Sequence, residues 1–253
     1  MAQALTLDKA AWSSPWRGRS VRDKGVLAGG LLILAIALPP WPGGAACGLA
    51  SLALLLGPAR VGAARLARSM ALPVVSILIG VATVAVSVGW PDGPRLSVTG
   101  AGLAMARDLA FRATAAVLAM FVLATTTPMV DLFGALRRAH VPAPLVEVAA
   151  LVYRMTFGLL TGAGAIHAAQ VSRLGYVNRR AAMRSAAMAA GAVFVRAWTR
   201  AERLESGLAG RGFEDSLAML EPTRRRSTPF LAASIALLAG LVAVGLLVPG
   251  GVG

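Results

Sequence analysis

The sequence predicts an all-α integral membrane protein with about five transmembrane helices and a long cytoplasmic domain inserted before the last of them. Three observations favour this fold class. The 253 residues are 57% hydrophobic and only 14% charged, whereas soluble domains carry about 25% charged residues. Several uncharged stretches approach the roughly 20 apolar residues that a spanning helix needs. The net charge of +14 is spread unevenly along the chain.

Uncharged runs predict where the spans lie. Residues 25–59 are uncharged but interrupted by Pro39-Pro40-Trp41-Pro42-Gly43-Gly44. Because prolines and glycines of this kind mark a turn, the run indicates a hairpin of two short spans. Pro91-Asp92-Gly93-Pro94 predicts a second turn, followed by the mixed segment 95–108. The predicted spans are residues 24–39, 43–59, 69–91, 109–127 and 229–248.

Basic residues predict the orientation in the membrane. Five lie in residues 1–24, three in 58–68 and fourteen, with seven acids, in 129–228. Basic clusters beside spans mark the cytoplasmic side and can contact the lipid bilayer. We therefore expect a multi-pass protein with a cytoplasmic N-terminus and an external C-terminus. The predicted divisions are a tail (1–24), four spans (25–128), a cytoplasmic domain (129–228), and a last span with an external tail (229–253).

The cytoplasmic segment is expected to form two long helices. Residues 143–172 are apolar enough to span, but a crossing would place the many arginines after it outside, so we expect a helix on the cytoplasmic side or in the interface. Gly158 and Gly162 would permit a close helix crossing. The next helix, 179–207, is amphipathic and carries one apolar and one basic face. Its apolar face contains Met183, Ala187, Ala190, Phe194 and Trp198, and its basic face contains Arg196, Arg200 and Arg203.

Candidate chemistry is sparse, so we expect no catalysis and no bound metal or cofactor. Cys47 is the single cysteine, which excludes an intrachain disulfide and a cysteine-based metal site. His140 and His167 have no carboxylate at ligand spacing. Asp108 and Arg112 are four residues apart and predict an ion pair on one helix. The basic charge does not indicate a nucleic-acid partner, because no recognisable binding module accompanies it.

Two short arginine–glycine motifs are the most informative feature. The first is Ala169-Gln170-Val171-Ser172-Arg173-Leu174-Gly175, and the second is Leu208-Ala209-Gly210-Arg211-Gly212-Phe213. Arginine binds carboxylates through a rigid fork of donors, and a following glycine ends a helix in a left-handed turn. Each motif is therefore interpreted as an exposed docking tip, with plain helix caps as the alternative.

The chain resembles the T component of energy-coupling-factor (ECF) transporters and, within it, the cobalt-type Q subunit (CbiQ). The resemblance covers nearly the whole chain. It is carried by Thr125-Thr126-Thr127-Pro128 and the residues that follow it, and by the two motifs, which match the places of two Ala-Arg-Gly-like signatures. Leu174 between Arg173 and Gly175, and Gly210 in place of the commoner alanine, depart from those signatures.

The resemblance implies a non-catalytic subunit of the inner membrane, whose two coupling helices cross and dock two ATPase subunits. Arg173 and Arg211 would make the contacts, supported by Ala169, Ser172, Gly175, Ala209 and Gly212. ATP and magnesium would be bound by the ATPases, and cobalt by a membrane substrate-binding component of the M or N type. Nickel or a vitamin such as biotin is the alternative cargo. A stand-alone secondary transporter is the competing class, although no internal repeat supports it.

Overall fold

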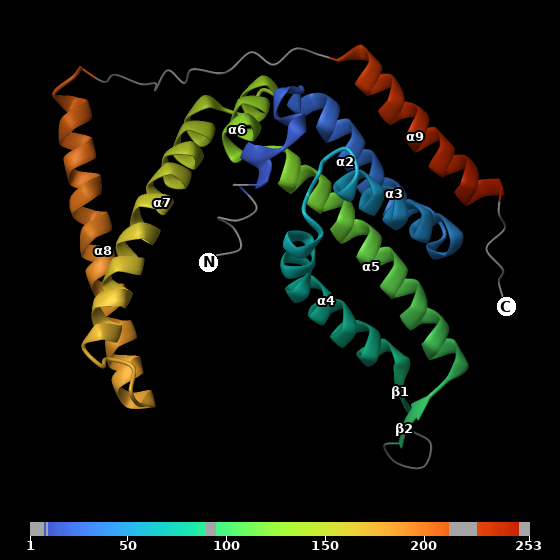
Figure 1. Ribbon diagram of the computed structural model, residues 1–253, viewed down its shortest axis with the longest axis horizontal. Helices are drawn as coiled ribbons and strands as arrows, with labels where there is room; N and C mark the ends of the chain where they lie inside the picture. Colours follow the sequence, from blue (N-terminus) through green and yellow to red (C-terminus); the bar gives the residue numbers. More distant parts are fainter. Residues whose placement is uncertain (1–7, 9, 90–94, 213–226, 248–253) are drawn as a thin grey trace. The chain divides into compact units, whose positions relative to one another are not determined.

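The computed structural model describes residues 8, 10–89, 95–212 and 227–247, almost all of them in helices (Figure 1). The chain divides into two compact units. The first consists of Met1–Leu132 and Pro222–Gly253, and the second is Phe133–Glu221. The second unit lies within the segment 129–228 that the sequence assigns to the cytoplasmic domain.

The first unit begins with the predicted pair of short helices. Helix α2 spans Val21–Ala37, and α3 spans Ala45–Leu56. Between them, the proline- and glycine-rich segment η2 (Pro40–Gly44) contains non-helical backbone at Trp41. Prolines lack the N–H that a continuing helix needs, so the chain turns here as expected. Helix α2 starts three residues before the predicted span and includes Lys24.

The third predicted span, 69–91, has different boundaries in the structure. Helix α4 covers Ala63–Ala85, after which β1 (Val86–Gly89) pairs antiparallel with β2 (Arg95–Val98). β-Branched valines at positions 84, 86 and 88 and the closely following glycine favour this change from helix to hairpin. The predicted turn at residues 91–94 and Trp90 lie outside the described residues.

The fourth predicted span, 109–127, begins earlier than the sequence indicated. Helix α5 covers Gly100–Thr126, so most of the mixed segment 95–108 is helical. The side chain of Thr99 accepts a hydrogen bond from the Gly102 N–H at 3.1 Å, which satisfies one of the free donors at a helix start. Charged residues in the first half of α5 lower its hydropathy, so the hydropathy pattern placed the start of the span after this cap.

Helix α5 lies at the centre of the first unit and packs against α2, α3 and α4, while α9 (Thr228–Leu247) packs against α2 (Figure 1). The shared core is apolar and includes Leu31, Cys47, Leu55, Ala119 and Val122, all with at most 1% of their surface exposed. Within the described residues, four helices, α4, α5, α7 and α9, are long and apolar enough to cross a membrane, and η2 with α3 forms a shorter apolar helix. The predicted all-α, multi-pass membrane class is therefore confirmed.

A buried polar junction joins three segments of the first unit. Lys24, which is 1% exposed, donates a hydrogen bond of 2.8 Å from its Nζ atom to the carbonyl of Thr126 at the end of α5. Next to it, Asp23 accepts a hydrogen bond of 3.2 Å from the backbone N–H of Ser227 before α9. Because the last carbonyls of a helix lack intrahelical partners and carry partial negative charge, a buried ammonium stabilises this end of α5.

The second unit is an antiparallel pair of long helices. Helix α7 covers Ala143–Ser172 and α8 covers Arg179–Ala209. The chain enters α7 from α6 (Met129–Arg138) through a turn in which His140 has a φ of 63°. The boundary between the two units falls within α6. The long helices contact each other near the turn that joins them and diverge towards their other ends (Figure 1).

The faces of α8 differ from the amphipathic arrangement expected from the sequence. The predicted apolar face is largely exposed: Met183 is 75%, Phe194 65% and Trp198 59% accessible. The predicted basic face is the one nearest α7, where Arg196 and Arg200 lie over glycines. This arrangement is possible because glycines leave room for the long arginine stems, whose charged ends still reach the solvent.

Candidate docking site

The first arginine–glycine motif forms a Schellman cap at the end of α7. The Gly175 N–H donates to the carbonyl of Gln170 at 2.8 Å, and the Leu174 N–H donates to that of Val171 at 3.0 Å. These two bonds are the defining pair of this cap. Contrary to the expectation for Gly175, the left-handed residue is Leu174, with a φ of 59°. The inserted leucine therefore takes the backbone position that glycine usually occupies.

Gly175 is required by space rather than by its backbone angle. A Cβ atom there would lie 2.6 Å from the Ser185 Oγ atom and 2.9 Å from the Gln170 carbonyl oxygen. The Ser185 hydroxyl donates to the Gly175 carbonyl at 2.8 Å, and the Gln170 amide donates to the Ser185 carbonyl at 2.9 Å. Tyr176 adds a hydrogen bond of 2.8 Å to the Gln170 side chain. These bonds fix the first tip to the beginning of α8.

Tyr176 and Ser185 support the first tip, although no sequence motif pointed to them. Neither has an unusual neighbour along the chain, and each becomes informative only when α8 folds back on α7. Arg173 itself is exposed, and it is flanked by the exposed side chains of Leu174 and Val177.

Two supporting residues of the first tip lie just before its arginine. The Ser172 hydroxyl donates to the Ala169 carbonyl at 2.9 Å, one turn back on α7. Both residues are exposed, so they shape the surface next to Arg173 and leave its side chain accessible.

The second motif ends α8 with glycines of two kinds. Gly210 has helical angles, with φ −66° and ψ −13°, whereas Gly212 has a φ of +68°. The Arg211 N–H donates to the Leu208 carbonyl at 3.0 Å, and the Gly212 N–H donates to that of Ala209 at 3.1 Å. The predicted left-handed glycine after the arginine is therefore present here. Phe213 lies outside the described residues.

The antiparallel pairing places the two tips at opposite ends of α8. At a rise of 1.5 Å per residue, a helix of 31 residues separates them by about 45 Å. Arg173 and Arg211 are both exposed. Within the described ranges, neither guanidinium group takes part in an ion pair. Two free, widely separated guanidinium groups could each bind a carboxylate or a carbonyl-lined groove on a different protein.

The proposed helix-crossing glycines face α8. An added Cβ atom at Gly158 would lie 3.5 Å from the nearest guanidinium nitrogen of Arg200, and one at Gly162 would lie 3.3 Å from that of Arg196. The space above these glycines is thus occupied by arginine side chains.

The other candidates from the sequence lie apart from the tips or serve the packing. Asp108 pairs with Arg107 at 3.2 Å, so the expected pair with Arg112 is wrong. The His167 ring packs edge-on against Tyr176, with 4.8 Å between centroids. Cys47 is buried in the core. No group of three or more potential metal ligands occurs among the residues that the structure describes.

The fold defines a multi-pass membrane protein whose α7–α8 hairpin has an exposed arginine at each end. Comparison with known proteins assigns the chain to a family. Residues 13–220 match the family model of the cobalt transport protein CbiQ. The chain belongs to the CbiQ family.

Three relatives carry related names. A cobalt transport protein CbiQ of Rhodobacter capsulatus is 38% identical over 242 residues, which cover 96% of this chain and 98% of that protein. A CbiQ of Salmonella typhimurium is 35% identical over 113 residues, covering 45% of this chain and 50% of the relative. A putative fused cobalt transport protein CbiMQ of Methanocorpusculum labreanum is 28% identical over 145 residues, covering 57% of this chain and 24% of the relative.

Proposed function

We propose that this chain is the transmembrane coupling subunit of an ATP-driven, ECF-type importer of cobalt ions. The observation that carries the proposal is the separation of Arg173 and Arg211 at opposite ends of one helical hairpin. Each tip would dock one of two cytoplasmic ATPase subunits. The match over nearly the full length of a relative named for cobalt transport supports the choice of cargo over nickel or a vitamin.

Coupling would act through rigid-body movement. ATP binding and hydrolysis would move the two docking grooves, and the hairpin would transmit that movement to the first unit and to a substrate-binding membrane component. The bonded first tip suits this role, because it ties the end of α7 to the beginning of α8 through Gln170 and Ser185. The hairpin would pivot at the Gly158–Gly162 region, where α7 and α8 cross.

Because the partner subunits would bind the nucleotide and the metals, we expect this chain to bind no cofactor. ATP and magnesium would be held by the ATPases, and cobalt by the substrate-binding component. The relative described as a fused CbiMQ protein supports a membrane component as the second partner. The hairpin and the N-terminus would lie on the cytoplasmic side of the cell's inner membrane, and the C-terminus would lie outside.

Charge reversal at the tips tests the proposal. We expect Arg173→Glu and Arg211→Glu each to reduce ATP-dependent uptake of radiolabelled cobalt by at least about tenfold, because a lost charged hydrogen bond and a new repulsion act together. Uptake and ATPase activity are measured in vesicles that contain the complete complex. The matched control is Arg65→Glu, an exposed arginine of the first unit, whereas both tips belong to the second unit. Normal uptake and ATPase coupling in the double variant would rule out docking through the arginines.

The competing class, a secondary transporter, makes the opposite prediction for the isolated chain. Purified alone and reconstituted in vesicles with an ion gradient, this chain should not take up cobalt. Gradient-driven uptake under these conditions would favour the secondary transporter.

A further inference from the structure

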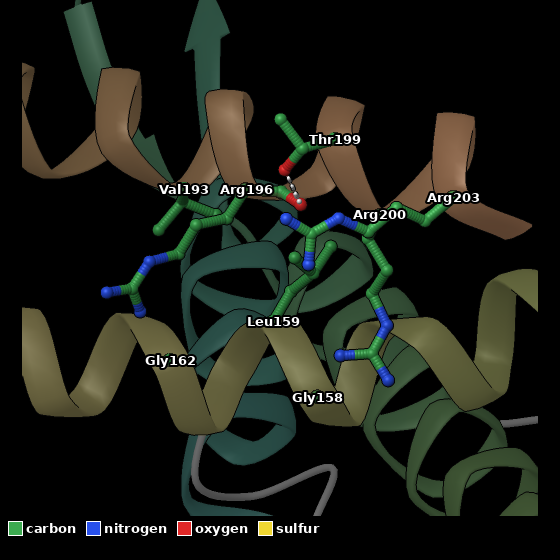
Figure 2. Close-up of a pocket in the computed structure, with 8 residues that line it drawn as sticks. All are labelled: Gly158, Leu159, Gly162, Val193, Arg196, Thr199, Arg200 and Arg203. Carbon is green, nitrogen blue, oxygen red and sulfur yellow. Dashed lines mark hydrogen bonds between the residues drawn. The ribbon is translucent and has the colours of Figure 1, made fainter.

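A groove lined by three arginines lies on the seam between α7 and α8. It has a volume of about 400 Å³, and Gly158, Leu159 and Gly162 line it from α7. Arg196, Arg200 and Arg203 line it from α8, together with Val193 and Thr199. Figure 2 shows the side chains of Arg196 and Arg200 extending from α8 towards Gly162 and Gly158. The groove therefore combines a concentrated positive charge with a glycine floor.

The positive charge of the groove has no partner in the described part of the chain. None of its three guanidinium groups takes part in an ion pair there. Glu202, which neighbours Arg203 in sequence, instead accepts a hydrogen bond of 2.8 Å from the Trp198 indole. Glu205 lies about 20° from Phe194 on a helical wheel with a step of 100° per residue, which places it towards the exposed apolar face. Three like charges in one groove repel one another unless an anion binds between them.

The shape and lining of the groove select the chemistry of that anion. Guanidinium groups bind phosphate oxygens through paired, charge-assisted hydrogen bonds. Leu159 and Val193 add an apolar wall, which suits the glycerol and acyl portions of a lipid better than a fully hydrated ion. Helix α7 also has the length and hydropathy of a membrane-spanning helix, so one side of the groove is compatible with a bilayer surface. Basic pockets between helices of membrane proteins bind anionic headgroups.

We propose that this groove binds a phosphate group, presented by the headgroup of an anionic phospholipid. The site is distinct from the tips at Arg173 and Arg211, and it does not depend on the docking of ATPases. A bound headgroup would neutralise part of the repulsion between the arginines and hold α8 against α7. A soluble phosphate is the second possible source of the same chemistry.

Native mass spectrometry of the full chain in mild detergent tests the site. Phosphatidylglycerol, phosphatidylcholine and inorganic phosphate are titrated separately. We expect Arg196→Gln/Arg200→Gln/Arg203→Gln to weaken phosphatidylglycerol binding by at least roughly tenfold, because charge-assisted bonds from three arginines are lost. The matched control, Arg179→Gln/Arg180→Gln/Arg184→Gln, removes the same charge from the same helix outside the groove, and we expect a change of no more than about twofold.

A fourth variant fills the groove without removing charge. Gly162→Leu would place a side chain where the nearest atom is the flexible guanidinium end of Arg196, at 3.3 Å from its Cβ position. We expect it to weaken phosphatidylglycerol binding while circular dichroism shows unchanged helix content. Equal losses in the two arginine triples would overturn the site. Binding of inorganic phosphate without a preference for phosphatidylglycerol over phosphatidylcholine would overturn the lipid assignment.

Discussion

At the scale of single residues, the two arginine tips use different means to end a helix. Leu174 adopts the left-handed conformation at the first tip, and Gly212 adopts it at the second. The sequence predicted an exposed arginine at each tip but placed the left-handed turn at Gly175. Spacing alone cannot separate a glycine required for its φ angle from one required for space, because the second depends on Ser185, a residue of the next helix.

The second tip offers a comparison of two glycines that lie two residues apart. We expect Gly210→Ala to stabilise the end of α8 by about 1 kcal/mol, because Gly210 is helical and alanine is the better helix former. Gly212→Ala should destabilise it by about 1–2 kcal/mol, because its φ is left-handed. Hydrogen exchange of the amides at residues 206–212 measures both. Faster exchange in Gly210→Ala than in Gly212→Ala would contradict the described cap.

At the scale of elements, the sequence predicted the existence of the long helices better than their ends. Apolar runs indicated α4, α5 and α9 because the bilayer imposes a length on each span. The missed boundaries depend on local bonds. Thr99 caps α5, which begins at Gly100, nine residues before the predicted start. The β1–β2 hairpin begins at Val86, so α4 ends six residues before the predicted end. Hydropathy does not record such bonds. It also could not show that the arginines of α8 lie against α7, since that choice depends on the glycines of a different helix.

The buried junction at Lys24 carries a prediction at this scale. Lys24→Met keeps the apolar stem but removes the ammonium that binds the Thr126 carbonyl, leaving a buried acceptor without this donor. We expect a loss of about 1–3 kcal/mol in the free energy of unfolding. Arg22→Met, at an exposed position two residues earlier, is the matched control and should change stability by less than about 0.5 kcal/mol. Thermal unfolding in detergent compares the two, and equal melting temperatures would refute the capping role of Lys24.

At the scale of the whole molecule, the main question is the side of the membrane on which the hairpin lies. Helix α7 satisfies the length and hydropathy of a span, but the arginines that follow it favour a cytoplasmic hairpin. The length and hydropathy of α7 are compatible with a crossing, whereas the charge distribution predicts a cytoplasmic helix, so the topology stays a prediction. The motifs identified the CbiQ family by resemblance, and the comparisons confirmed that family.

Labelling of introduced cysteines tests this topology. In a Cys47→Ala background, Leu174→Cys replaces an exposed residue beside the first tip, and Trp41→Cys replaces an exposed residue of the turn before α3. We expect a membrane-impermeant maleimide to label position 174 only from the cytoplasmic side and position 41 only from the outside. Labelling of position 174 from the outside would show that α7 crosses the membrane.

The unlike caps of the two tips also have a consequence for symmetry. A single chain that ends one helix with Leu174 and the other with Gly212 presents two different surfaces. If the two proposed ATPase partners are copies of one protein, each copy would meet a different surface, and assembly would break the two-fold axis of the ATPase pair. One copy would then bind the end held by Gln170 and Ser185, while the other would bind the end held by backbone bonds to Leu208 and Ala209.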